Sequence, residues 1–178
     1  MQRKQIEKIA ISAVMAALYV GLDYLAVSVS APFGGTMKLS IAGLTVIIVA
    51  ALFGAVWGAA TGFVGAFVGQ MITYGFTATT VLWCLPALFR GITFGLIFLM
   101  MKKNTKPWAL LVPTVISSLI VTAINTCVMY IDAKIYHYPV VLFGISLVNR
   151  ILAGVITAIV FAIILPPIIN GVKKVVKG

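Results

Sequence analysis

Apolar residues fill this chain in long runs, which are broken by short segments rich in glycine, proline or basic residues. The longest uncharged stretch covers residues 39–89, which are 51 residues without an Asp, Glu, Lys or Arg. A transmembrane helix needs about 20 mainly apolar residues. The pattern therefore predicts one membrane-spanning helix over about residues 9–27, three within 39–101, one within 107–131 and one within 140–170.

Turn signals separate the predicted spans. The segment Ser30–Gly35 contains proline and two glycines and predicts a loop after the first span. Phe53-Gly54-Ala55 predicts a tight turn, and Gly75–Thr80 predicts a second turn. We expect the segment Asp132–Pro139 to connect the last two spans outside the membrane.

Nine of the thirteen Lys and Arg residues form three clusters. Cytoplasmic loops carry an excess of such residues, so all three clusters are expected in the cytoplasm, with an even number of spans between them. We predict an all-α fold, a bundle of six transmembrane helices with both termini cytoplasmic, and a single domain over residues 1–178. The clusters are Arg3, Lys4 and Lys8; Lys102, Lys103 and Lys106; and Lys173, Lys174 and Lys177.

The composition excludes several classes of protein. Hydrophobic residues make up 62% of the chain and charged residues 9%, against roughly half and a quarter in soluble domains. With three acidic residues, one histidine and no GxxxxGK[ST] motif, we expect no catalytic set, no metal site, no cofactor and no ATP hydrolysis by this chain. The net charge is +10, and most of the basic residues that carry it lie in clusters between the apolar runs. They therefore indicate membrane topology rather than binding of nucleic acid.

Polar residues within the predicted spans are the candidates for function, because ionisable groups are costly in a bilayer. Arg90 lies 12 residues before Lys102, or about 18 Å of helix, which places it near the midplane of the membrane. The same arithmetic places the other polar groups of the spans in the outer half. We therefore predict a binding pocket open to the outside, formed by Asp23, Gln70, Tyr74, Trp83, Arg90, Asn125, Asn149 and Arg150.

Arg90 and Arg150 together exceed Asp23 by one positive charge at this level. A surplus guanidinium in a dry pocket favours a carboxylate or phosphate ligand. The alternative is that Asp23 pairs with one arginine while the other extends towards water or backbone carbonyls. Gln70 and Asn125 fit interhelical hydrogen bonds equally well, and Trp83 and Tyr74 fit an aromatic belt at the membrane surface.

Two stripes of small residues follow the helical repeat. Gly54, Gly58, Gly62, Gly65 and Gly69 in the third span predict close packing against neighbouring helices. The first span has a second stripe, formed by Ala10, Ala13, Ala17 and Gly21, which would be a docking surface if it faces outward.

The chain as a whole resembles the substrate-binding S components of energy-coupling factor (ECF) transporters, which import vitamins and trace metals in prokaryotes. The resemblance rests on chain length, the span pattern, the Ala13-x-x-x-Ala17 stripe, the segment Met37–Ser40 and the stretch Leu52–Ala59, which is similar to the family's LxGxxxG region. It implies a protein of the prokaryotic cell membrane that captures a vitamin and docks through its first helix on a membrane scaffold subunit, which two ATPases drive.

Within this family, the segment from Gln70 to Trp83, followed by Leu85-Pro86 and Arg90-Gly91, is most similar to the pantothenate-type branch. The resemblance implies that Arg90 and Asn125 hold the polar ends of the ligand while Gln70, Trp83 and Asn149 line the pocket. Folate and hydroxymethylpyrimidine or pyridoxine are the competing ligands. Hypotheses from other classes are an intramembrane enzyme that acts on a lipid-linked substrate, and an assembly subunit without a ligand.

Overall fold

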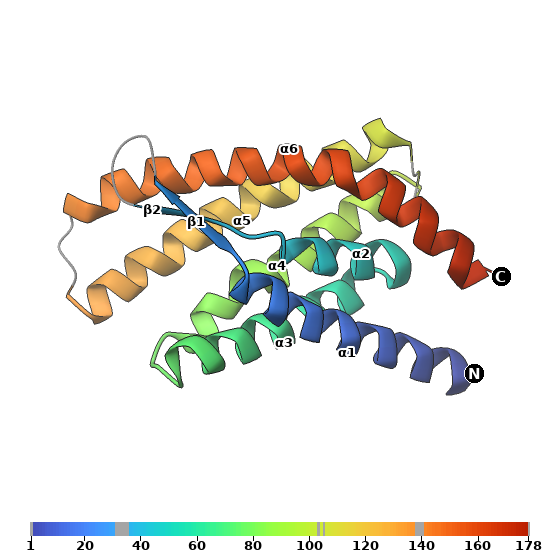
Figure 1. The fold of residues 1–178 in the computed structure, drawn as a ribbon, viewed down its shortest axis with the longest axis horizontal. Coiled ribbons are helices and arrows are strands. Elements are labelled where there is room, and N and C mark those ends of the chain that lie inside the picture. The colour runs from blue at the N-terminus through green and yellow to red at the C-terminus, as the bar shows by residue number, and fades with distance from the viewer. Residues whose placement is uncertain (1, 31–35, 103, 105, 138–140, 178) are drawn as a thin grey trace.

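Helices dominate the computed structural model, which describes residues 2–30, 36–102, 104, 106–137 and 141–177. Within these residues, six helices and one two-stranded hairpin form an elongated bundle (Figure 1). The elements in chain order are α1 (Gln2–Tyr24), β1 (Val27–Ser30), β2 (Thr36–Leu39), α2 (Gly43–Phe53), α3 (Ala55–Tyr74), α4 (Thr80–Met100), α5 (Pro107–Ile135) and α6 (Val141–Lys177).

Five of these helices are long and apolar enough to cross a membrane, namely α1, α3, α4, α5 and α6. Helix α2 has only 11 residues, so it extends about 16 Å and cannot cross a hydrocarbon core of about 30 Å. The prediction of six full spans is therefore not confirmed for the second helix. Its length is limited by the expected turn at Gly54, where the positive φ of 101° ends one helix before the next begins.

The short helix α2 lies inside the bundle. It packs against α1, α3, α4 and α6, and eight of its eleven residues are buried. Around it lies the main apolar core, in which Ile47 of α2 contacts a cluster that includes Phe94, Phe98, Phe161 and Leu165. One end of the bundle is therefore filled by α2, whereas the other end lacks a central helix.

Small residues bring the helices into close contact, as the stripe in the third span predicts. A side chain at Gly58 would meet Ala50 of α2, and one at Gly62 would meet the backbone carbonyl of Ala87 in α4. A side chain at Gly65 would meet Tyr19 of α1, at 2.9 Å. The packing interpretation is confirmed for these three glycines.

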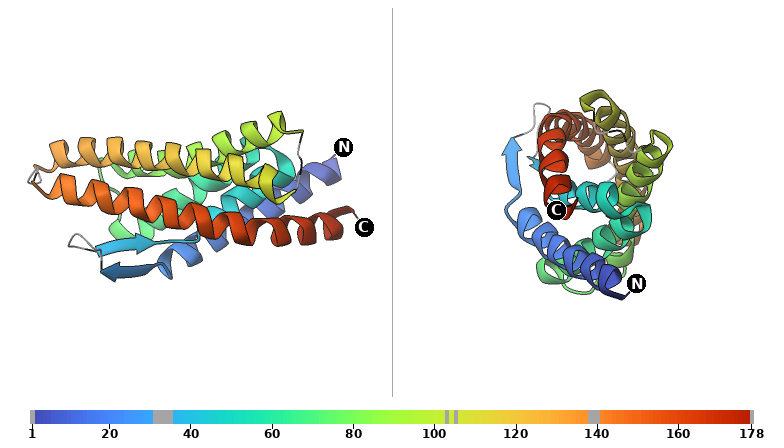
Figure 2. Two further views of the ribbon diagram at one scale, coloured as in Figure 1. Left: turned by 90° about the horizontal axis from the view of Figure 1, so that it is seen from above. Right: turned by 90° about the vertical axis from the view of Figure 1, so that its right-hand side faces the viewer.

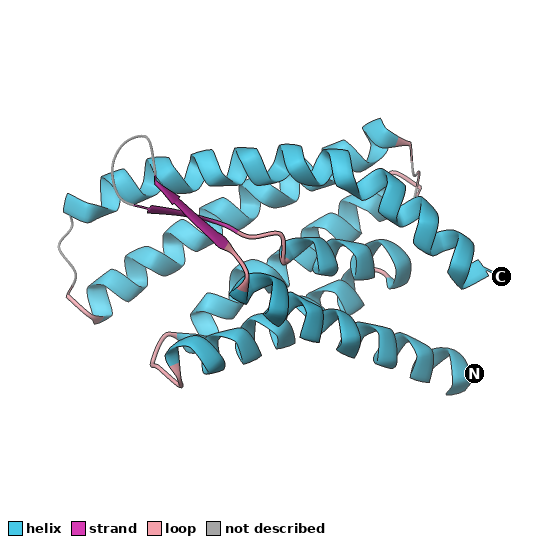
Figure 3. Ribbon diagram, viewed as in Figure 1, coloured by secondary structure: helices cyan, strands magenta, loops and turns pink. Residues whose placement is uncertain are grey.

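Strands β1 and β2 form an antiparallel hairpin on either side of the predicted loop, and neither strand was predicted from the sequence (Figure 3). Val27 pairs with Leu39 and Ser30 with Thr36. Strand β2 contacts α6, so the hairpin lies against the outside of the helix bundle (Figure 2). The rest of the predicted loop, residues 31–35, lies outside the described residues.

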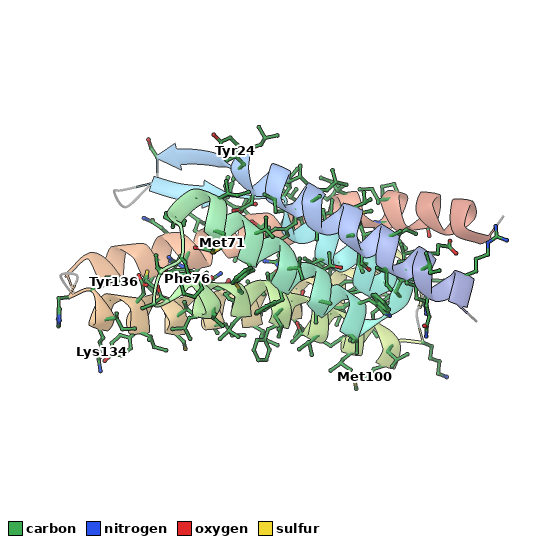
Figure 4. All side chains as sticks on the ribbon, turned by 90° about the horizontal axis from the view of Figure 1, so that it is seen from below. Tyr24, Met71, Phe76, Met100, Lys134 and Tyr136 are labelled. Carbon is green, nitrogen blue, oxygen red and sulfur yellow. The ribbon has the colours of Figure 1, made fainter. Side chains whose placement is uncertain are left out.

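The two chain termini lie at the same end of the elongated bundle (Figures 1 and 2). The opposite end carries the turn between α3 and α4 and the end of α5, where Phe76 and Tyr136 lie, whereas Met100 lies towards the terminal end (Figure 4). The connection expected to begin at Asp132, at this opposite end, differs from the structure. Helix α5 continues to Ile135, so Asp132 belongs to a helix and not to a connecting segment.

Candidate functional site

A cavity of about 810 Å³ occupies the half of the bundle that α2 does not fill. Ser40 and Gly43, at the N-terminal end of α2, line its inner part, while Tyr74, Thr77 and Tyr136 line it at the end opposite to the chain termini. The cavity therefore has a simple physical origin, because a central helix of half length leaves the other half of the bundle interior empty. Its volume lies within the range of small-molecule sites.

All eight residues predicted to form the pocket line this one cavity. Besides Asp23, they are Gln70, Tyr74, Trp83, Arg90, Asn125, Asn149 and Arg150. Their exposure varies with depth: Asn149 is 5% exposed and buried in the wall, whereas Tyr74 is 68% exposed. The structure thus brings together side chains from α3, α4, α5 and α6 that are up to 80 positions apart in the sequence.

The charge balance of the cavity differs from the one expected from the sequence. Asp132 lines the cavity together with Asp23, Arg90 and Arg150. Two carboxylates and two guanidinium groups give a formal charge of zero, whereas the prediction that omitted Asp132 gave +1. The argument for an anionic ligand from a surplus charge is therefore wrong.

Arg90 lies at the inner part of the cavity and is closely surrounded. Its guanidinium carbon lies 5.5 Å from the centre of the Phe161 ring, in a cation–π contact. A Cβ atom at Gly43 would come within 2.9 Å of this guanidinium, so the absence of a side chain there makes room for it. Within the described residues, the buried Nη1 atom of Arg90 has no hydrogen-bond partner. Arg90 also lines the cavity, so its guanidinium carries donor groups into this part of the bundle.

The other end of the cavity carries a connected polar group of four side chains. The Asp132 carboxylate accepts a hydrogen bond from the Thr79 hydroxyl, with an oxygen–oxygen distance of 2.6 Å. It also accepts one from the Trp83 indole, with a nitrogen–oxygen distance of 3.3 Å. The guanidinium carbon of Arg150 lies 5.5 Å from the centre of the Trp83 ring. These contacts link the start of α4 to α5 and α6.

Asp23, the second carboxylate of the cavity, contacts a different part of the chain. It accepts a hydrogen bond from the Ser40 hydroxyl at 3.0 Å, which ties α1 to the segment that leads into α2.

Among the residues that the structure describes, no group of three or more His, Cys, Asp or Glu side chains could hold a metal ion.

The arrangement of helices and cavity agrees with a comparison of the sequence with known families. Residues 3–174 match the family described as ECF-type riboflavin transporter, S component. The chain belongs to this family. The resemblance to S components is thus confirmed, whereas the assignment to the pantothenate-type branch is not supported. The family consists of transporter components and not of enzymes, which removes the intramembrane-enzyme alternative.

A solved structure described as the S component of a bacterial ECF transporter is similar in fold to this S component. The TM-score is 0.66 and the sequence identity 17%, and the match covers 95% of this chain and 99% of the other. At this identity the likeness concerns the fold alone. A comparison with curated proteins gives no match.

The small-residue stripe of the S component's first helix faces away from the bundle. Ala10, Ala13, Ala17 and Gly21 are all exposed, whereas Ala16 on the neighbouring face of α1 is only 6% exposed. The condition set for a docking surface, namely that this face looks outward, is therefore met.

Several cavity residues of the S component were missed by the sequence analysis, including Tyr19, Ser118 and Asp132. A signal for two of them is present in the sequence. Ser118, Asn125 and Asp132 are each seven positions apart, which places them on one face of a helix. Because Asn125 was a candidate already, this spacing could have added both neighbours.

Proposed function

We propose that this S component captures riboflavin from outside the cell and delivers it to an ECF module for import. The observation that carries the proposal is the family match over residues 3–174. The surplus positive charge that favoured pantothenate disappears once Asp132 is counted in the cavity. No observation on the cavity therefore favours an anion over a neutral vitamin.

The chemistry of the cavity suits riboflavin, which is uncharged and combines a flat ring system with a polyhydroxyl chain. Pro86, Ala87 and Val121 give the cavity apolar wall, against which a flat ring can be buried. Arginine, asparagine and glutamine side chains supply hydrogen-bond donors between these apolar parts. A ligand with carbonyl and hydroxyl groups but no net charge can satisfy them without adding an unpaired charge.

Arg90 is proposed to donate a hydrogen bond from its guanidinium group, which lines the cavity, to an oxygen of the ligand. Loss of a hydrogen bond from a charged donor costs about 1.5–3 kcal/mol, so Arg90→Ala should lower riboflavin affinity at least about tenfold. Arg90→Lys should restore it only in part, because an ammonium group lacks the planar fork of donors. Riboflavin affinity within about twofold of the parent in Arg90→Ala, measured by calorimetry, would contradict this role.

The proposed partners of this S component are a membrane scaffold subunit and two ATPase subunits. The exposed stripe of Ala10, Ala13, Ala17 and Gly21 supports a close helix–helix contact with the scaffold, because small residues let backbones approach within the bilayer. The common end of the two termini, with the basic clusters near it, supports a cytoplasmic location for that end in a prokaryotic cell membrane.

Mass spectrometry of small molecules that copurify with the protein tests the proposal directly. The protein is expressed in cells supplied with riboflavin, pantothenate, folate and pyridoxine together, and is purified in detergent. We expect riboflavin in the sample from the parent protein and a strongly reduced amount from Arg90→Ala. Pantothenate or another vitamin in place of riboflavin would refute the assignment of the ligand, and a sample without any of these vitamins would favour the assembly-subunit hypothesis.

A further inference from the structure

Asp132 lines the cavity and connects the end of α5 to the start of α4. It lies in the last turn of α5, three residues before the helix ends at Ile135, and the backbone N–H of Tyr136, which caps the helix, donates to the Asp132 carbonyl at 2.9 Å. Its side chain is directed across to the start of α4, where it contacts Thr79 and Trp83. The start of α4 is the positive end of that helix's dipole, which stabilises the Asp132 carboxylate beside it.

Trp83 is held on two sides by this arrangement. Its backbone N–H donates to the Thr79 carbonyl at 3.1 Å in the first turn of α4, which fixes where the side chain begins. The indole N–H donates to Asp132 at 3.3 Å, which fixes how the ring is rotated. Arg150 then lies over the ring with its guanidinium carbon at 5.5 Å from the centre. An aromatic ring at a cavity wall is thus given one orientation before any ligand enters.

We propose that Asp132 is a positioning residue that holds the Trp83 indole as a stacking platform for the flat ring of the ligand. The inference rests on the proposed function, because it takes the ligand to be a flavin. It goes beyond the proposed function, because it states which side of the cavity receives the flat ring and which residue orients the indole on that side. Preorganisation of this kind raises affinity by reducing the ordering that binding requires.

The chemistry of the carboxylate explains why an acceptor is needed here. The indole N–H and the Thr79 hydroxyl are both donors in this contact, so the residue between them must accept two hydrogen bonds. Both hydrogen bonds end on Oδ1 of Asp132, and the side-chain carbonyl oxygen of asparagine likewise has two lone pairs to accept them. Asp132→Asn should therefore preserve the position of the indole, whereas Asp132→Ala should release it.

Fluorescence reports the position of the indole without a ligand. The chain has three tryptophans, so Trp57→Phe combined with Trp108→Phe leaves Trp83 as the sole tryptophan. In this background, Asp132→Ala should lower the fluorescence anisotropy of Trp83, and Asp132→Asn should leave it within error. Asp23→Ala is the matched control, because it removes the same charge from the same cavity at a carboxylate that accepts a hydrogen bond from Ser40. We expect no change in Trp83 anisotropy for this control.

Riboflavin fluorescence then reports the stacking itself. An indole stacked on an isoalloxazine ring quenches the excited flavin by transfer of an electron that afterwards returns. Riboflavin bound at saturating protein should therefore be dark in the parent and in Asp132→Asn, and brighter in Asp132→Ala and in Trp83→Leu. Affinity should fall at least about fivefold in Asp132→Ala, as base–aromatic stacking energies indicate. A purely structural role would weaken binding in Asp132→Ala but leave the bound flavin as dark as in the parent.

The outcomes separate this inference from the proposed function. If the parent protein does not bind riboflavin, the proposed function fails, while the anisotropy of Trp83 still tests whether Asp132 positions the indole. If the parent binds riboflavin and Trp83→Leu leaves its brightness unchanged, the stacking platform is refuted. If Asp132→Ala leaves both anisotropy and brightness unchanged, Asp132 does not position Trp83. A thermal unfolding scan of each variant identifies any loss of fold.

Discussion

The contact between Gly43 and Arg90 predicts a variant that separates ligand binding from folding. A methyl group at position 43 would stand 2.9 Å from both the Cζ and Nε atoms of Arg90. Carbon atoms in ordinary contact are about 3.5–4.0 Å apart, so the guanidinium must move by about 1 Å. A hydrogen bond of about 2.9 Å that is lengthened to about 3.9 Å no longer exists.

The expected effect of Gly43→Ala on binding follows from this displacement. Loss of a hydrogen bond from a charged donor costs about 1.5–3 kcal/mol, which is about a tenfold to 150-fold lower riboflavin affinity. The cost to folding should stay below that of a rigid clash, about 1–3 kcal/mol, because the obstructed atoms are the end of a flexible side chain.

Calorimetry with riboflavin and a thermal unfolding scan measure the two effects of Gly43→Ala. Gly69→Ala is the matched control, since Gly69 also lines the cavity but a Cβ there meets no atom within 4 Å. We expect the control to keep its thermal midpoint or raise it slightly, because alanine favours a helix over glycine by about 1 kcal/mol. Unchanged riboflavin affinity in Gly43→Ala would refute the reasoning that the guanidinium must occupy this place.

Further predictions concern the docking surface and the helix packing. Ala13→Trp or Ala17→Trp should abolish ATP-driven uptake by cells that carry the whole transporter, while riboflavin binding by the purified protein persists; loss of both activities would leave the docking surface unsupported. Gly62→Ala should destabilise the protein by about 1–3 kcal/mol, because the added methyl meets the rigid backbone carbonyl of Ala87. Its thermal midpoint should therefore fall relative to that of Gly69→Ala, and equal midpoints would contradict the packing observed between α3 and α4.

Much of the cavity could be predicted from the sequence because the rise of a helix is constant. Arg90, Asn125 and Arg150 lie in three different helices, yet residue counts from the predicted membrane boundaries placed them at one level, and all line one cavity. Polar residues are costly within a bilayer, so the few that lie in the predicted spans are the candidates for a functional role. A small number of intramembrane polar groups was therefore enough to find the site.

The ends of the helices could not be predicted as well, and the error had a chemical consequence. Apolar runs indicate where a span lies but leave its ends uncertain by a few residues. Asp132 was placed in a connection because the apolar run ends near residue 131, whereas α5 continues for another turn and carries the carboxylate into the cavity. One helical turn thus changed the predicted charge of the cavity from +1 to zero.

The short length of α2 could have been inferred from the sequence, but hydropathy alone does not show it. A buried interior helix and a membrane span are both apolar on all sides, so hydropathy does not distinguish them. The helix is limited by the segment after β2, which ends at Leu39, and by the expected turn at Gly54. The cavity exists because of this short length, so the turn at Gly54 carried more information about the site than composition did.

Titration of the purified, ligand-free protein with riboflavin and, separately, with pantothenate in a calorimeter tests the central claim most directly. The account predicts saturable binding of riboflavin and no measurable heat from pantothenate, since the cavity carries no surplus charge to hold a carboxylate. Saturable binding of pantothenate without binding of riboflavin would contradict it.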